Sequence, residues 1–270
     1  MTTEEKEVSY KVTHKMTQAE IIEALTGAID RGDHKYNDRL PSTRELAEKY
    51  GSSQQTVAAA LNVMAGMGMV QVQPGARAKV IAGPPRQIKL GTYLSANREV
   101  ATGKTAWTRD NGEGAKEGPT QVSQTLTTEA DADTGIPVGT EVVERTRTRY
   151  GSDGAPSQHK RTIVTFEAAR LTPEGWTGIP PMMSPGDTPP PPGMSLANWL
   201  GMDVERVVYK MGAATAAGSA AVALALPEGT PCLRIVSQGL NAEGKVAYST
   251  VTTAPLRSTI SMEIKEEDVE

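Results

Sequence analysis

The 270-residue chain is poor in cysteine, histidine and aromatic residues. It has one cysteine, Cys232, three histidines and an aromatic content of 4%. A single cysteine excludes an internal disulfide bond and any zinc site with several cysteine ligands. The histidines, His14, His34 and His159, are far apart and lack metal-ligand spacing, so we expect neither a metal nor a cofactor. With so few aromatic side chains, the cores must be filled mainly by Leu, Ile, Val, Met and Ala.

The chain also lacks a long apolar run. The longest one, Ala213–Leu226, is interrupted by Thr215, Gly218 and Ser219 and is too short to cross a bilayer. The first residues, MTTEEKEVSYK, are charged and lack the apolar core of a signal peptide. We therefore expect a cytoplasmic protein without a membrane partner.

A strong excess of positive charge is missing as well. Residues 1–86 hold 11 Lys and Arg against 10 Asp and Glu, a net charge of +1, and the whole chain carries −4. The overall charge is weak evidence about nucleic-acid binding, because binding depends on where the cations cluster.

The first part of the chain has the pattern of three helices followed by a β-hairpin. Thr17 with Glu20 and Ser42 with Glu45 have the spacing of helix-capping boxes, and a third helix is predicted to begin near Ser53. The segment GMVQVQPGARAKVIAG then alternates around a Pro-Gly turn, as a short hairpin does. We expect the helices to bury Ile21, Ile22, Leu25, Ile29, Leu46, Ala47, Tyr50, Val57, Ala60, Leu61, Met64 and Met67.

The second and third of these helices have the spacing of a helix-turn-helix. Counted from Thr43, the fifth residue is Ala47, the ninth is Gly51 and the fifteenth is Val57. The motif requires a small residue, a turn glycine and an apolar residue at these places. The alternative is an ordinary helical hairpin.

The second part of the chain contains an internal repeat. IPVGTEVVERTRTRYGSDGAPSQ, residues 136–158, matches LPEGTPCLRIVSQGLNAEGKVAY, residues 226–248, at a constant offset of 90. Each copy has the pattern of a turn, a strand, a tight turn and a second strand. We therefore expect a pseudo-symmetric sheet within one domain.

The segment DRLPSTRELAEKYGSSQQTVAAALNVMAGMGMVQVQPG resembles the signature of the GntR family of bacterial transcription regulators. Leu40–Ala47 corresponds to the family's L-P-S-x-R-x-L-A opening, and the recognition helix and a Pro-Gly wing follow it. The resemblance implies a winged helix-turn-helix that binds double-stranded operator DNA. The residues expected at this interface are Ser42, Arg44, Ser53, Gln54, Gln55, Thr56, Ala58, Arg77 and Lys79.

The recognition helix differs from the family pattern, which commonly has arginine where this chain has Gln54 and Ala58. Glutamine pairs with adenine in the major groove, whereas arginine prefers guanine. We therefore expect Gln54 and Gln55 to read bases. Phosphate contacts would come from Arg44, from the helix N-terminus at Ser53 and Thr56, and from the wing.

The repeat-containing part resembles the UTRA effector-binding domain of the HutC-like branch of that family. This resemblance implies an α+β fold overall, in which the winged helix-turn-helix is joined to a chorismate-lyase-like α+β domain. It also implies a homodimer on a palindromic operator and a small-molecule effector. We expect residues 8–83 to form the DNA-binding domain, residues 84–89 a linker, and residues 90–264 the effector domain.

Strand alternation places Arg145, Arg147 and Arg149 on one face, where three cations repel one another unless an anion or carboxylates lie nearby. The resemblance implies that such arginines bind an anionic effector, for example a phosphorylated sugar or an organic acid. The candidate effector residues are Arg145, Arg147, Arg149, His159, Lys160 and Tyr248. The alternative is that the arginines pair with Asp and Glu or contribute to a dimer surface.

No Ser/His/Asp or paired-carboxylate arrangement stands out in the sequence, so we expect no catalytic residue and no enzyme. The principal hypothesis is a repressor released from its operator by the effector. The alternatives are a DNA-binding repressor with a vestigial ligand pocket and an enzyme on a chorismate-lyase-like scaffold.

Overall fold

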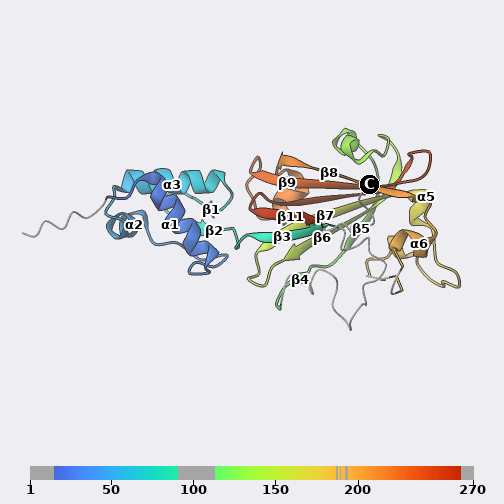
Figure 1. Ribbon diagram of the computed structural model, residues 1–270, viewed down its shortest axis with the longest axis horizontal. Helices are drawn as coiled ribbons and strands as arrows, with labels where there is room; N and C mark the ends of the chain where they lie inside the picture. The colour runs from blue at the N-terminus through green and yellow to red at the C-terminus, as the bar shows by residue number, and fades with distance from the viewer. Residues whose placement is uncertain (1–14, 91–112, 187, 189, 192–193, 263–270) are drawn as a thin grey trace, which may run out of the picture.

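The computed structural model describes residues 15–90 and 113–262, except residues 187, 189 and 192–193. The expected domain limits at residues 8 and 264, and His14, lie outside the described residues. Two bodies lie side by side, a helical one from the N-terminal part and a sheet-rich one from the remainder (Figure 1). The fold class is α+β.

The helical body has the order of a winged helix. Its elements are α1 (Gln18–Asp30), α2 (Thr43–Lys49), α3 (Gln54–Gly66), β1 (Val70–Gln71) and β2 (Lys79–Val80). The strands β1 and β2 pair antiparallel, and an isolated bridge joins Arg39 to Lys79. The three helices and the hairpin are therefore confirmed, with strands of two residues each.

The helix starts are set by local hydrogen bonds. Thr17 with Glu20 and Ser42 with Glu45 form capping boxes in which each partner bonds the other's backbone N–H. Gly51 follows α2 with φ of 58°, a left-handed conformation that glycine adopts without steric cost. These features confirm the predicted turn between α2 and α3.

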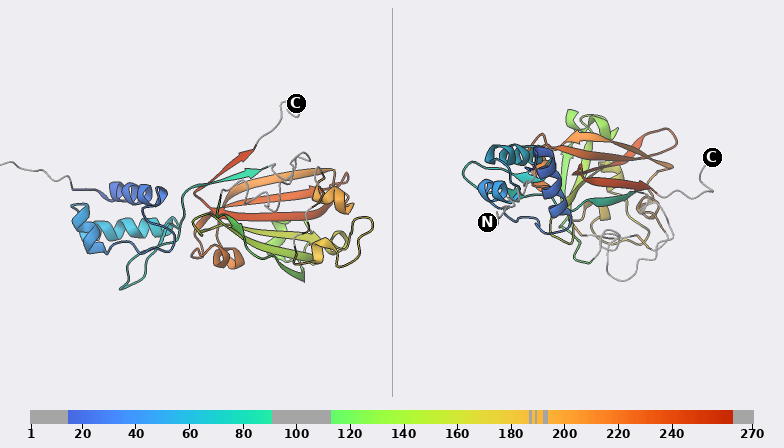
Figure 2. Two further views of the ribbon diagram at one scale, coloured as in Figure 1. Left: turned by 90° about the horizontal axis from the view of Figure 1, so that it is seen from below. Right: turned by 60° about the vertical axis from the view of Figure 1, so that its left-hand side comes forward.

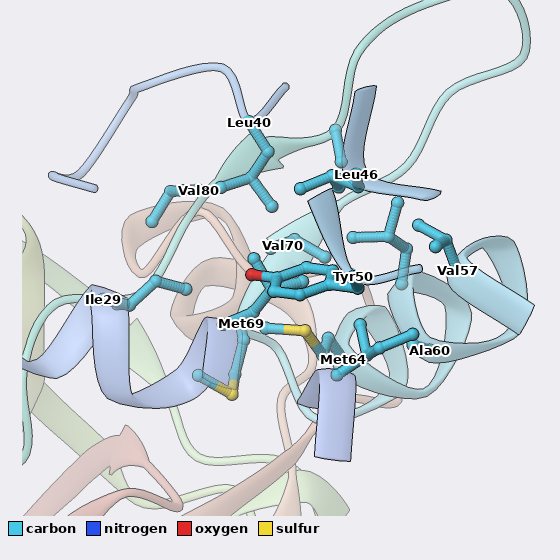
Figure 3. Packing of buried hydrophobic residues seen from close by; sticks show 14 of the residues in the cluster. Ile29, Leu40, Leu46, Tyr50, Val57, Ala60, Met64, Met69, Val70 and Val80 are labelled. Atoms are coloured by element: carbon cyan, nitrogen blue, oxygen red, sulfur yellow. The ribbon is translucent and has the colours of Figure 1, made fainter. Parts of the chain in front are cut away.

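The core of this body gathers side chains from all three helices and the hairpin, as Figure 3 shows around the Tyr50 ring. Ile22 packs against this core half-buried. Met67 was predicted to be buried, and this is wrong, because 47% of its surface is exposed. Met67 follows the last residue of α3, so its side chain leaves the buried stripe of the helix.

A seven-stranded sheet forms the second body. Its strands are β4 (Lys116–Glu117), β5 (Gln121–Leu126), β6 (Glu141–Tyr150), β7 (Pro156–Thr165), β8 (Arg206–Thr215), β9 (Pro231–Leu240) and β10 (Val246–Pro255). Their order is β4-β6-β7-β10-β9-β8, β5 also pairs with β6, and every pair is antiparallel. The short helices are η1 (Glu129–Thr134), α5 (Phe166–Ala169), η2 (Pro181–Met183), α6 (Leu196–Leu200) and α7 (Gly218–Ala223). No helix within the described ranges has the length and apolarity needed to cross a membrane.

The internal repeat is confirmed as two equivalent hairpins. The bounds of β9 and β10 are those of β6 and β7 shifted by 90 residues. The two tight turns repeat a hydrogen bond, from Gly154 N to Gly151 O at 2.9 Å and from Gly244 N to Asn241 O at 3.0 Å. At the centre of the sheet, Arg161 lies opposite Val251, its own counterpart in the repeat. The two copies are therefore related by a pseudo-twofold axis near this pair.

The predicted linker, residues 84–89, includes the start of a β-strand. Pro84 and Pro85 do interrupt the chain, but β3 (Arg86–Leu90) begins directly after them and pairs in parallel with β11 (Ser258–Met262). Figure 2 shows these two strands side by side, apart from the main sheet. Ile88 and Ile260 pack on Ile235 and Ala254 of that sheet, and this contact supplies burial that a two-stranded ribbon lacks by itself.

Candidate DNA-binding and effector-binding sites

The N-terminal end of α3 presents uncharged side chains to solvent. Gln54 and Gln55 are exposed in the first turn, and Ala58 is half-buried one turn later. Val57, between them, is fully buried in the core, which fixes the rotation of the helix about its own axis. The two glutamine amides are therefore free to reach a ligand outside the domain.

Ser53 and Thr56 are engaged in capping this helix. The Ser53 hydroxyl accepts a hydrogen bond from Thr56 N at 3.0 Å and lies 2.7 Å from the Thr56 hydroxyl. The cap thus satisfies one of the N–H groups that the sequence assigned to a phosphate. Other N–H groups of the first turn have no partner within the helix and still point out of it.

The wing lies against the start of α2. Arg77 forms an ion pair of 3.1 Å with Glu45, the glutamate of the α2 capping box. Hydrogen bonds from Ser42, followed by the nearby Arg77 and Arg44, lower the pKa of Glu45, so its carboxylate stays charged at neutral pH. The Ser42 hydroxyl accepts from Glu45 N at 3.2 Å.

The two remaining predicted cations lie beside this contact. Arg44 is exposed and pairs with Glu48 at 3.3 Å, one turn along α2. Lys79 is half-buried on β2, opposite Gln71. Arg44 and Arg77 both lie near the Glu45 carboxylate. Surface ion pairs of this kind are weak, so a phosphate can readily replace the carboxylate as the partner of either arginine.

Residues 17–80 match the family of bacterial regulatory proteins known as the gntR family. The N-terminal domain belongs to the GntR family. The match identifies α2 and α3 as the helix-turn-helix of a DNA-binding domain, and Gln54 and Gln55 lie at the exposed N-terminal end of α3.

Solved structures resemble the whole chain only loosely. A protein described as a GntR-family transcriptional regulator has 17% identity and a TM-score of 0.48, covering 94% of this chain and 99% of its own. PhnF from Mycobacterium smegmatis has 18% identity and a TM-score of 0.44, covering 93% and 100%. The effector domain of PhnF alone has 15% identity and a TM-score of 0.37, covering 57% and 90%. Curated protein sequences gave no match.

Beyond the GntR-family domain, five of the six predicted effector residues share one face of the sheet. Arg147 lies directly opposite Lys160 on β7, and Arg145 and Arg149 lie one pleat away on either side. Tyr248 of β10 lies on the same face, opposite Val164. We call this surface, made of Arg145, Arg147, Arg149, Lys160 and Tyr248, the cationic face.

A carboxylate from β4 lies among these cations. Glu117 forms ion pairs of 3.1 Å with Arg147 and 2.7 Å with Arg149, and its own side chain is almost fully buried. The sequence indicates that three arginines on one face need a neighbouring anion. It does not identify Glu117 as that anion, because Glu117 lies on a separate strand. The alternative of arginines paired with carboxylates is therefore realised for Arg147 and Arg149.

Lys160 sits in a positive electrostatic environment. Burial, followed by the charge of Arg149, lowers the pKa of Lys160 to about 7, although Glu117 acts in the opposite direction. Arg147 and Arg145 contribute further to the lowering. An anion bound on the cationic face would offset this repulsion and raise the pKa of the lysine again.

Arg145 holds residues 181–184 of a Pro-rich loop against the sheet. Its guanidinium donates to the carbonyl oxygens of Pro181 at 3.2 Å and Met182 at 3.0 Å, and also to that of Ser184. Beside it, Val122, Ser123, Gln124, Val143, Met183 and Pro185 line an open groove of about 290 Å³. A cation thus lies next to a groove with both polar and apolar lining residues.

His159 is separated from the other predicted effector residues. It lies on the opposite face of β7, because successive side chains of a strand alternate. Burial lowers its pKa, and neither ring nitrogen has a hydrogen-bond partner within the described part of the chain. The same opposite face carries Arg161, which pairs with Asp131 and Glu144, a buried network that the sequence did not reveal.

No group of three or more His, Cys, Asp or Glu side chains in the described ranges is arranged to hold a metal ion.

Proposed function

We propose that this chain is a dimeric transcription repressor that binds a palindromic operator through α3 and the wing. The observation that carries the proposal is the exposed pair Gln54 and Gln55 at the recognition end of a GntR-family helix-turn-helix. Glutamine amides read adenine in the major groove. Arg44 and Arg77, on either side of Glu45, supply the phosphate contacts.

Release from the operator would follow binding of a small anion on the cationic face, within a UTRA-like effector domain of residues 90–264. The ligand shifts the population of domain arrangements, so that two winged helices of a homodimer no longer match adjacent half-sites. The positive environment of Lys160 supports an anionic ligand, and the adjacent groove supports one with an apolar portion.

The DNA-binding part of the proposal is tested by footprinting the full chain on the DNA upstream of its own gene. We expect protection of a palindrome with two half-sites about one helical turn apart. Equal affinity for this DNA and for unrelated DNA at moderate salt would contradict it.

A second candidate is a repressor that responds to no ligand. The pairing of Arg147 and Arg149 with Glu117, and of Arg145 with backbone carbonyls, favours it because each arginine already has a partner. Thermal melting of the chain with inorganic phosphate, sugar phosphates and organic acids separates the two candidates.

If the effector is an anion of constant charge over this range, such as a carboxylate, the rise in Tm should be larger at a pH about one unit below 7 than about one unit above it. The reason is that Lys160 is protonated below its pKa of about 7. Lys160→Met should remove this pH dependence. Lys245→Met, at an exposed lysine, should retain it. A Tm unchanged by every anion would favour the ligand-independent repressor.

A further inference from the structure

The two bodies meet at a junction with a defined set of contacts. Gly68, two residues beyond α3, lies against Thr230 and Leu226 of the sheet domain, where a Cβ on Gly68 would come within 2.8 Å of the Thr230 methyl carbon. Ile81, beyond the wing, joins a buried cluster with Leu226 and Cys232. The C-terminal end of the recognition helix therefore rests on the sheet domain.

Two ion pairs flank Gly83 at this junction. Arg257, in the turn between β10 and β11, pairs with Asp30 at the end of α1 and donates to the Gly83 carbonyl at 3.0 Å. On the other side, Arg86 pairs with Asp153 of the β6–β7 turn, and the two side chains are only 14% and 18% exposed. One pair crosses between the bodies, and the other fixes the connecting segment.

Two glycines make the Arg86–Asp153 contact sterically possible. A Cβ on Gly151 would collide with the Arg86 guanidinium, so that group lies directly on the Gly151 backbone. A Cβ on Gly83 would collide with the Asp153 carboxylate. The Asp153 oxygen that accepts from Arg86 also accepts from Ala155 N at 3.1 Å, which ties the ion pair to the fold of the turn.

This turn is continuous with the strand that carries the cationic face. Arg149 precedes Gly151 by two residues, and the β6–β7 register shifts between Arg149 and Tyr150, as it does at a β-bulge. The Arg149 carbonyl also accepts from the Ser157 hydroxyl at 3.0 Å, across the base of the turn. A movement of Arg149 would therefore also move the Gly151 backbone, which the Arg86 guanidinium contacts.

The repeat supplies an internal comparison. The equivalent turn of the second copy, Asn241–Gly244, has the same hydrogen bond, but its Asn241 amide donates to Asp203, three residues before β8 begins. The residue at the position of Arg149 in that copy is Gly239, which faces the Tyr248 ring. Of the two related turns, the one that contacts the connecting segment is the one joined to the cationic face.

We propose that the β6–β7 turn, residues 151–154, transmits occupancy of the cationic face to the winged helix through the Arg86–Asp153 ion pair. This inference rests on the proposed function for its ligand, but the junction itself can be tested without ligand or DNA. In the proposed state the ion pair and the Gly83 contacts hold the recognition helix in one position relative to the sheet domain.

The test is a distance measurement between spin labels on cysteines introduced at Glu23 of α1 and Val222 of α7 in the full chain. Both positions are exposed, and the native Cys232 is buried. The labelled chain is mixed with an excess of unlabelled chain, so that in a dimer only the distance within one chain is measured. The otherwise unaltered chain should then give one narrow distance distribution. Asp153→Asn removes the charge of the ion pair, and Gly83→Ala places a methyl group against the Asp153 carboxylate. Each variant should therefore broaden or split the distance distribution. Asp133→Asn, which removes the Arg234–Asp133 pair elsewhere on the sheet domain, is the matched control and should keep it.

Transmission is tested by Arg149→Gln, which alters the cationic face but no junction residue. It should shift the distribution of the labelled chain and have no further effect in the Asp153→Asn background. A narrow distribution in both junction variants would overturn the ion pair as a restraint. If Asp153→Asn broadens the distance distribution but Arg149→Gln leaves it unchanged, transmission from the cationic face is overturned. Circular dichroism confirms that each variant is folded, and a chain that passes these tests but binds no operator would refute only the proposed function.

Discussion

At the residue scale, the proposed function requires a neutral surface of α3 to read DNA. Gln54 and Gln55 are exposed while Val57 anchors the same turn in the core. Base specificity and electrostatic affinity are then assigned to different residues, with the amides on α3 and the cations Arg44 and Arg77 beside it.

We expect Gln54→Ala to relax base preference at one position in each half-site, at a cost of about 1–3 kcal/mol for the preferred base, because a bidentate amide contact to adenine is lost. Competition binding with operators varied at single positions measures this effect. Gln121→Ala, at an exposed glutamine of β5, is the control and should bind as the unaltered chain does. An equal loss of affinity for every sequence would instead identify Gln54 as a backbone contact.

Residue-scale reasoning did not identify partners that come from elsewhere in the chain. Strand alternation placed Arg145, Arg147 and Arg149 on one face correctly, but the partners of Arg147 and Arg149 include Glu117 of another strand. His159 and Lys160 were both predicted as effector residues, whereas neighbouring residues of a strand face opposite sides.

At the element scale, short hydrogen bonds decide where the helices begin. Thr17, Ser42 and Ser53 each accept a hydrogen bond from an N–H of the turn that follows, and all three are evident from sequence spacing. These caps are local, so tertiary packing does not change them. The cap at Ser53 also lies where a phosphate would approach.

Because Ser53 caps α3, we expect Ser53→Ala to lower the free energy of unfolding by about 1 kcal/mol. Ser53→Asp should preserve the cap, since aspartate is an equally good N-cap, but should weaken DNA binding by placing a negative charge near the phosphate backbone. Urea unfolding and gel-shift titration of the two variants separate these effects. Loss of DNA binding without loss of stability in Ser53→Ala would show that the hydroxyl itself contacts DNA.

At the scale of the whole molecule, the sheet is a duplicated hairpin unit whose two copies serve different purposes. In the first copy, Arg145, Arg147 and Arg149 line the cationic face. In the second, the strand position of Arg145 is held by Ile235, which packs beneath the β3–β11 ribbon. The two copies thus share a backbone fold but differ in their side chains. The first copy carries the arginines of the cationic face, and the second packs against β3, which leads to the winged helix.

The sequence by itself determined what depends on neighbours within a few residues or on exact repetition. The caps, the helix-turn-helix spacing, the hairpin wing and the 90-residue repeat are of this kind, because helix starts and tight turns are fixed by local hydrogen bonds and backbone sterics. The repeat predicted two strand pairs with the correct relative bounds.

Only the tertiary structure decided which distant segments meet. β3 pairs with β11 although more than half of the chain separates them, and Arg257 reaches Asp30 and Gly83. Such contacts depend on the burial of surfaces that form only when the sheet is complete, and no local spacing encodes them. Met67, placed in the core by its helical spacing, instead follows the last residue of α3 and lies exposed where the winged helix meets the sheet domain.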